Sequence, residues 1–295
     1  MANRLSRRWS RTTAAPAVDW RTAARQLEAE VKRVTAMLRS VPDPAAPALG
    51  QWSVAEVAMH LSQAWIAVPG MARQDLGEVR AMLPSVGDRS LVPDIWALGD
   101  LTVDGVEADP ERDPAVLADR IEARAAAYLA ALDGAPTDRR PWMVEGTEVP
   151  LVTLTCHLLN ETLVHGWDIA TASGRRWELP AAAAVTVLDG FLGVVLRELG
   201  SALVDPVVAA GLRATYEVRV RGGGRHVFVF DDGELTVEPP SDRPVDCVIT
   251  ADPAALLLVI WNRMDQAAAI VERKLVPSGP QPELAPRLRS LMRNP

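Results

Sequence analysis

The sequence is poor in cysteine, and its two thiols follow no pattern of redox or metal chemistry. Cys156 and Cys247 are the two cysteines among 295 residues, and both lie in apolar stretches far apart in the chain. A disulfide framework needs several cysteines at short spacings, and a redox or metal motif needs a C-x-x-C pair. The sequence therefore predicts two inert core residues and excludes a disulfide-stabilised scaffold.

The sequence also lacks long apolar runs and an excess of basic residues. No stretch approaches the roughly 18 apolar residues of a membrane-spanning helix, and the basic start of the chain lacks the apolar segment that follows in a secretory signal. The formal net charge is −7, and the arginines are scattered among acidic residues, which argues against nucleic-acid binding. We expect a cytoplasmic protein with no nucleic-acid or membrane partner, whose residues 1–17 form a flexible tail.

Apolar residues at steps of three and four predict a helical bundle over roughly the first two hundred residues. One helix covers residues 19–39. Another starts at Ser53, which is spaced to form a capping box with Glu56. A third starts at Asp113, where a capping aspartate is followed by Pro114 in the first turn.

The intervals between these helices carry weaker patterns. We expect a helix over residues 71–83. Residues 84–112 are rich in proline, glycine and aspartate, so we expect a long irregular connection there, which could form a lid or wall of a site. A long apolar helix ends near Ser173, and Pro180 starts the next one.

The pattern changes to strands after residue 205. Alternating apolar residues predict four strands, at residues 215–221, 226–230, 234–238 and 245–250. A helix starts at Asp252 and further helical stretches follow. The fold class is therefore α+β with two domains: a helical bundle over residues 18–205 and a small antiparallel-sheet domain over residues 206–295.

A ladder of polar residues lies inside the long apolar helix. His157, Glu161 and His165 are spaced four apart, so they share one face, and Asp168 lies close beside them. The helix is apolar nearly all round, and burying ionisable groups is costly unless they pair or bind a metal. Two interpretations remain open: a zinc-type metal site, or a hydrogen-bonded pair of Glu161 with either histidine in the core.

His60 lies at the edge of the apolar stripe of the helix that starts at Ser53, beside the small residues Ala64 and Ala67. A lone histidine at such a position is more often a satisfied core residue than a ligand. Together with the ladder, however, it would give two histidines and one carboxylate from two helices. That set leaves a coordination position open, as catalytic zinc sites do.

Two segments resemble the DinB-like, mycothiol-dependent maleylpyruvate isomerase family. Residues 50–61 read Gly-Gln-Trp-Ser-Val-Ala-Glu-Val-Ala-Met-His-Leu and match its W-[ST]-x-x-[DE]-x-x-x-H-L segment; residues 161–170 match its E-x-x-x-H-x-x-D helix. The second half is similar to the sterol-carrier-like domains appended to that family, at residues 231–233, 246–251 and 275–279. The resemblance implies a DinB-like four-helix bundle that holds a divalent metal, usually Zn²⁺, on His60, Glu161 and His165, with mycothiol as cosubstrate.

Four further residues are candidates for catalysis or binding. His157 could act as acid or base, support a metal ligand, or simply belong to the core. Asp168 could orient the ring of His165 or cap local backbone. Arg219 and Arg221 alternate onto one face of the first predicted strand, where a fork could hold a substrate carboxylate, although such a pair is more often a solvated outer face.

The resemblance implies a thiol transferase or a thiol-assisted isomerase. A metal-bound thiolate would attack a small-molecule electrophile, while the two cysteines of the chain remain spectators. Two alternatives remain open from the residues. The same ligands could activate water in a hydrolase or lyase without a thiol, or the chain could be a non-catalytic protein that binds a small apolar molecule or a partner.

Overall fold

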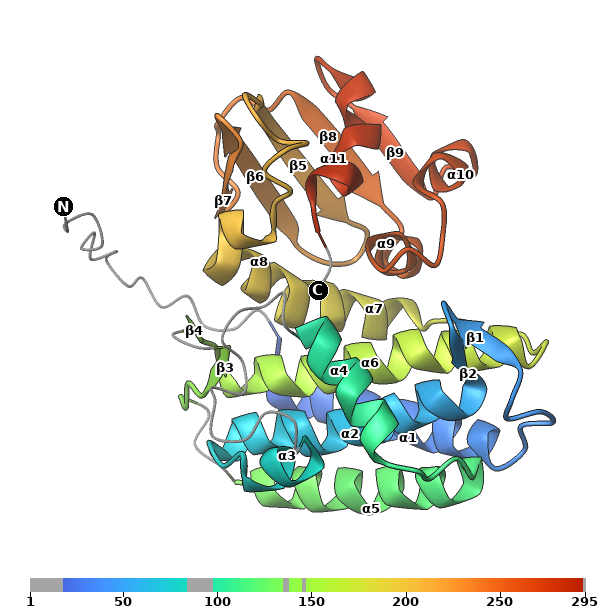
Figure 1. The fold of residues 1–295 in the computed structure, drawn as a ribbon. Coiled ribbons are helices and arrows are strands. Elements are labelled where there is room, and N and C mark those ends of the chain that lie inside the picture. Colours follow the sequence, from blue (N-terminus) through green and yellow to red (C-terminus); the bar gives the residue numbers. More distant parts are fainter. Residues whose placement is uncertain (1–17, 84–97, 135–137, 145–146, 294–295) are drawn as a thin grey trace.

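Long helices that pack side by side form the lower half of the molecule in Figure 1. The computed structural model describes residues 18–83, 98–134, 138–144 and 147–293. The bundle consists of α1 (Trp20–Leu38), α2 (Val54–Arg73), α5 (Pro114–Leu132) and α6 (Leu151–Ala172). A small sheet domain lies above it, so the predicted α+β fold class with two domains is confirmed. The tail predicted at residues 1–17 lies outside the described residues.

Capping side chains fix the starts of α1 and α2, and the capping box predicted at Ser53 is present. Asp19 caps α1 by accepting a hydrogen bond from the Thr22 amide at 2.9 Å. Ser53 and Glu56 form the complete capping box of α2, with each side chain accepting from the other residue's backbone amide. These interactions satisfy amides that the first turn of a helix leaves without partners.

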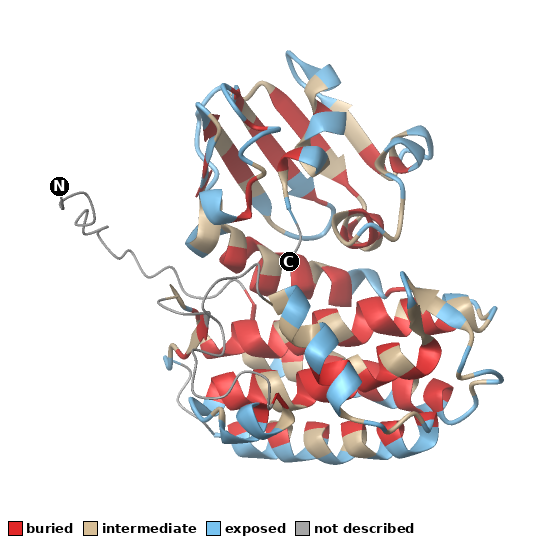
Figure 2. Cartoon of the chain, in the orientation of Figure 1, coloured by how far each residue is buried: buried red, intermediate tan, exposed pale blue. Residues whose placement is uncertain are grey.

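Helix α6 is the central element of the bundle. It packs against α1 and α2 on one side and against α7 (Ala181–Val187) on the other. Figure 2 shows it buried along most of its length. The polar residues of α6 therefore lie inside the molecule, as its apolar surroundings in the sequence predicted.

Two predictions for the interval between α2 and α5 were wrong. The helix expected over residues 71–83 does not exist as one element, because α2 continues through Pro69 and Gly70 to Arg73. Gln74, which has a left-handed backbone, caps its end. The short helix α3 (Gly77–Met82) follows. The connection expected over residues 84–112 contains the helix α4 (Leu98–Ala108), whose apolar residues were obscured by neighbouring aspartates and glycines. Residues 84–97 lie outside the described residues.

A continuous helical segment joins the two halves of the molecule. It comprises α7, a π-helical turn η2 (Leu188–Leu192) and α8 (Gly193–Leu199), and it crosses between α6 and the sheet in Figure 1. Asp189 in this turn accepts hydrogen bonds from the Gly224 amide at 2.8 Å and lies 3.0 Å from His226 Nε2. The turn therefore ties the bundle to the sheet domain, which fits the frequent occurrence of π-turns at functional places.

The sheet has five strands in the order β7-β6-β5-β8-β9. The strands are β5 (Arg213–Val220), β6 (Arg225–Asp231), β7 (Glu234–Glu238), β8 (Cys247–Ala251) and β9 (Leu275–Ser278). The expected purely antiparallel sheet needs correction, because β5 and β8 pair in parallel. The chain leaves β7 at one edge and crosses to the far side of β5, where β8 enters in the same direction. Strand β9 was not predicted.

Helices cover one face of the sheet, and two small hairpins border the bundle. The remaining elements are β1 (Pro47–Leu49), β2 (Trp52–Ser53), β3 (Trp142–Val144), β4 (Thr147–Glu148), η3 (Gly200–Leu203), α9 (Pro253–Ile260), α10 (Gln266–Val271), η4 (Pro282–Leu284) and α11 (Ala285–Leu291). Within the described ranges, no helix is both long and apolar enough to cross a membrane.

Candidate metal centre

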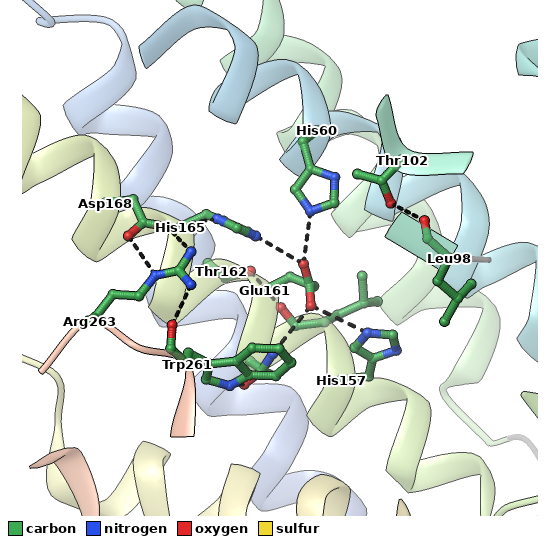
Figure 3. A network of polar contacts seen from close by, with 12 residues as sticks. His60, Leu98, Thr102, His157, Glu161, Thr162, His165, Asp168, Trp261 and Arg263 are labelled. Atoms are coloured by element: carbon green, nitrogen blue, oxygen red, sulfur yellow. Dashed lines mark hydrogen bonds and ion pairs between the residues drawn. The ribbon is translucent and has the colours of Figure 1, made fainter. Parts of the chain in front are cut away.

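Three side chains from two helices meet in the interior. Glu161 Oε2 lies 3.3 Å from His60 Nε2 and 3.3 Å from His165 Nε2. One ligand atom from each residue can be chosen so that all lie within 4.8 Å of one another. Figure 3 shows His60 on α2 and His165 on α6 pointing toward the carboxylate between them. The structure thus brings together the three residues that the sequence proposed as metal ligands.

Local helix geometry explains this convergence. Glu161 and His165 are one turn apart on α6, so both face α2. The capping box at Ser53 fixes the start of α2, and His60 lies two turns later on its inward side. The two imidazole rings meet edge to face, with centroids 4.7 Å apart.

Glu161 is a buried carboxylate in contact with three imidazoles. Its second oxygen, Oε1, lies 3.3 Å from His157 Nε2, and 12% of its side chain is exposed. Burial alone would raise the pKa of this group, but hydrogen bonds with His157, His165 and His60 outweigh burial and hold the pKa well below its usual value. Glu161 is therefore ionised, as a metal ligand must be.

The two histidines of the cluster differ in their electrostatics. Burial lowers the pKa of His60, and its hydrogen bond with Glu161 only partly offsets this effect. Burial also acts to lower the pKa of His165, but hydrogen bonds with Asp168 and Glu161 raise it to about 9. Binding of a cation at His165 Nε2 would replace a proton, so the affinity for metal should fall with decreasing pH.

The donor set fits a borderline divalent cation. Two imidazole nitrogens and one carboxylate oxygen are ligands of catalytic zinc sites, which keep a further position open. His165 Nδ1 lies 3.0 Å from Asp168 Oδ2, and this contact leaves Nε2 directed at the cluster. A carboxylate bonded to the far nitrogen of a histidine is the usual support for a metal-bound imidazole. The residues present therefore fit a metal such as Zn²⁺.

His157 borders the cluster without belonging to the ligand group. Its ring stacks on Phe191 of the π-helical turn, with centroids 4.3 Å apart and planes inclined by 8°. Nδ1 is buried and has no hydrogen-bond partner among the described residues. The contact of Nε2 with Glu161 means that His157 can hold the carboxylate oxygen that faces away from His60 and His165.

The sheet domain supports both ligands of α6. Arg263, just after α9, donates from Nε and Nη2 to the two oxygens of Asp168 at 2.9 and 2.7 Å. Trp261 Nε1 donates to Asn160 Oδ1 at 2.9 Å, and Asn160 Nδ2 donates to Glu161 Oε1 at 3.2 Å. Figure 3 shows Arg263 and Trp261 approaching the cluster from their own segment.

These two supporting residues were missed from the sequence. Arg263 and Trp261 are remote from α6 along the chain, and only the folded structure pairs them with Asp168 and Asn160. The one available signal was Asp168 itself, a buried aspartate that needs more than one partner. Its pKa is lowered because hydrogen bonds with His165 and Arg263 outweigh the opposing effect of burial.

The structure does not bring Arg219 and Arg221, the predicted binding fork, to the cluster. Arg219 pairs with Glu217 at 2.7 Å, and Arg221 Nη2 donates to the Arg273 carbonyl at 3.1 Å. Strand alternation turns Val218 inward toward the helices, so Arg219 projects from the opposite face of the sheet. Arg221 follows the end of β5 and lies in an exposed turn. Neither lines the cavity described next, and the solvated-face interpretation applies to them.

The cluster opens into a cavity of about 760 Å³. Helices α2, α4 and α6 form its walls on the bundle side, and α8, α9 and the inner face of the sheet form the other side. His60, His157, Glu161 and His165 all line it. A molecule in the cavity could therefore reach the open side of the cluster.

Two family models match separate parts of the chain. Residues 20–170, just over half of the chain, match the family described as mycothiol maleylpyruvate isomerase N-terminal domain. Residues 198–293 match the SCP-2 sterol transfer family. Sterol carrier protein 2 of Rattus norvegicus is 29% identical over 138 residues, which are 44% of this chain and 25% of that protein. The chain thus spans about a quarter of the length of this curated relative.

Two solved structures share the fold over most of the chain. They are crystal structures of the mycothiol-dependent maleylpyruvate isomerase and of a histidine-to-alanine mutant of it. Each has a TM-score of 0.50 at 12% identity and covers 90% of this chain and 96% of its own. At this identity the likeness shows the fold alone, and the family match carries the assignment. The resemblance inferred from the two motifs is confirmed: the chain belongs to the mycothiol maleylpyruvate isomerase N-terminal domain family.

Proposed function

We propose that the protein is a metal-dependent enzyme that uses mycothiol as cosubstrate to attack an electrophilic small molecule, as an isomerase or a transferase. The observation that carries the proposal is the cluster of His60, Glu161 and His165, which is open to a cavity in a chain of this family. Zn²⁺ is the proposed ion, because imidazole and carboxylate suit a borderline cation.

The three ligands would hold the ion, and it would supply a Lewis acid that lowers the pKa of a bound thiol. Other residues of the chain would hold the ligands in position. Asp168 fixes the orientation of the His165 ring and is itself held by both oxygens to Arg263. His157 and Asn160 contact Glu161 Oε1, so the carboxylate cannot rotate freely.

The apolar cavity wall would surround the attacking sulfur and the electrophile. The walls are largely leucine, valine, isoleucine and methionine side chains, and such surroundings keep a thiolate poorly solvated and reactive. Addition of the thiolate to an activated cis alkene, rotation about the resulting single bond and elimination of the thiolate would give the trans isomer. With a leaving group on the electrophile, the product would be a thiol conjugate.

The cysteines of the chain are not suited to supply the sulfur. Burial raises the pKa of Cys156 to about 12 and, together with nearby carboxylates, that of Cys247 to about 11. Neither belongs to the cluster or lines the cavity. An exogenous thiol is therefore the better candidate nucleophile.

The direct test measures turnover of a panel of maleyl and other electrophilic acids by zinc-loaded protein, with and without mycothiol. We expect turnover that requires both the thiol and the metal and that disappears in the His60→Ala variant, which should remain folded. Equal turnover without thiol would instead favour a hydrolase or lyase that activates water. Absence of turnover from a metal-loaded protein would favour a binding function.

A further inference from the structure

The cavity extends far beyond what the metal cluster needs. Its volume of about 760 Å³ lies in the upper part of the range, about 300 to 1,000 Å³, that is usual for sites of drug-sized ligands. Part of the wall lies away from the cluster, on α3, α4, α8, α9 and the sheet. The proposed function also places mycothiol in this cavity, but neither that polar thiol nor a four- to six-carbon acid would match the apolar part of the wall.

Half-buried apolar side chains gather on this wall. They come from helical segments that are distant in the sequence: Leu98 and Leu101 of α4, Leu192 of η2 with Leu196 of α8, and Leu256 and Ile260 of α9. Burying such side chains is favourable, and a contiguous group of them left partly exposed marks a binding surface more often than a packing fault.

The polar groups of the wall are unevenly placed. Apart from the cluster with its neighbours His157 and Arg263, the ionisable side chains on the described wall are His226, Arg289 and Arg293. His226 is already paired with Asp189, at 3.0 Å. The inner face of the sheet contributes apolar side chains, among them Val218 and Phe228. The cavity therefore offers a reactive polar site that continues into an apolar chamber shared by both domains.

We propose that the electrophile is an amphiphile: its reactive end lies at the cluster, and an apolar body about the length of a medium or long acyl chain fills the chamber between α4, α8, α9 and the sheet. This inference rests on the proposed function and specifies its substrate class. It also gives the sheet domain a role, since that domain supplies one wall of the chamber.

A series of N-alkylmaleamic acids tests the proposal, because the activated cis alkene stays the same while the alkyl tail grows from ethyl to tetradecyl. Each buried methylene contributes about 0.8 kcal/mol, so kcat/KM with mycothiol should rise about fourfold per methylene until the chamber is full. Thiol-dependent turnover that is flat along the series would overturn the substrate class and leave the proposed function intact.

Binding without turnover separates the two proposals. Metal-free protein should bind a fluorescent fatty-acid probe, and the longer maleamic acids should displace it at lower concentrations than the ethyl member. Such displacement, in a protein without thiol-dependent turnover of any member, would support the chamber and contradict the proposed reaction. Failure of the probe and of the longest acid to bind would overturn the chamber.

Paired substitutions on α8 locate the tail. Leu196→Trp places a bulky ring in the chamber, while Arg197→Trp places the same ring at the exposed neighbouring position, which does not line the cavity. We expect Leu196→Trp to raise the dissociation constant of the dodecyl member at least tenfold and to leave that of the ethyl member unchanged. Arg197→Trp should change neither.

A second substitution keeps the test valid if Leu196→Trp does not fold. Ala67→Phe fills the chamber from α2, on the opposite wall, and melting temperatures identify which variants are folded. Either folded variant should discriminate against long tails. Equal weakening of short and long members, or no weakening of the long ones, would contradict the placement of the tail.

Discussion

Glu161 and Glu217 are both buried carboxylates, but their partners differ in kind. Glu161 is surrounded by three imidazoles inside the bundle. Glu217 lies on the sheet with 4% of its side chain exposed, and it pairs with Arg219 and Arg225. Burial of a charge therefore does not by itself mark a functional site in this protein.

The partners decide what each carboxylate can do. A guanidinium keeps its charge at any physiological pH, so the Glu217 cluster is complete and offers no vacancy. Imidazoles can lose a proton and bind a metal through the same nitrogen. The Glu161 cluster is also open to the cavity, whereas the arginines around Glu217 are about half exposed to solvent. The following predictions exploit this contrast.

The largest difference is expected between Glu161→Gln and Glu217→Gln. The first removes a metal ligand and should weaken zinc binding by more than the ten- to hundredfold that is typical of losing a supporting residue, with turnover lost in parallel. The second should leave zinc affinity unchanged. Zinc titration of both metal-free variants measures the effect, and equal losses would contradict the assignment of the two sites.

A smaller effect is expected at Arg263. Arg263→Lys keeps the charge but removes the fork that holds both oxygens of Asp168, so the ring of His165 should be less well oriented. Zinc affinity should fall about tenfold to a hundredfold with little change in melting temperature. The control Arg243→Lys alters an exposed pair with Glu238 on the sheet and should not change zinc affinity.

The arginine cluster should affect stability alone. Arg225→Met leaves Glu217 with one fewer donor and should lower the free energy of unfolding by about 1–3 kcal/mol, measured by urea titration. Zinc affinity should stay that of the wild type. A change in metal binding would show that the sheet face communicates with the cluster.

The same cluster gives a pH dependence with a defined sign. Burial acts to raise the pKa of Glu217, but hydrogen bonds from Arg219 and Arg225 lower it overall. Its contribution to stability is therefore present above the unfolded value of about 4.5 and is lost as the pH falls below it. The stability advantage of the wild type over Glu217→Gln should shrink between about pH 5 and pH 3. An advantage that grows in acid would contradict this account.

The smallest effect is expected at Cys156. Its pKa is raised to about 12 by burial, so it should not contribute a thiolate at neutral pH. Cys156→Ser should keep kcat/KM within about twofold of the wild type, and the native thiol should resist alkylation. A loss of turnover in a folded variant would reassign the nucleophile to the chain.

Local patterns allowed much of the cluster to be predicted. The spacing of Glu161 and His165 places them on one face of a helix, and the capping box of Ser53 sets the phase that turns His60 inward. Such features depend on helix geometry alone. Bringing α2 beside α6 required the family resemblance, because no local pattern states which helices pack together.

The remaining features depend on tertiary pairing. Arg263 reaches Asp168 only because the loop after α9 docks on α6, and no periodicity encodes that contact. The binding fork was predicted because strand alternation places Arg219 and Arg221 on one face of the strand. The sequence does not say whether that face of the sheet is covered by helices or exposed to solvent. The parallel pairing of β5 with β8 was missed for a similar reason. The residues of a strand do not indicate whether the connection before it is a hairpin or a crossover.

The central claim is that His60, Glu161 and His165 together bind one metal ion. Calorimetric titration of zinc into metal-free protein tests it directly, with His60→Ala, Glu161→Gln and His165→Ala titrated beside the wild type. We predict one ion per chain for the wild type, weaker binding as the pH falls below about 9, the pKa of His165, and loss of that site in every variant. A wild-type protein that binds no ion, or a tight site that survives all three substitutions, would contradict the account.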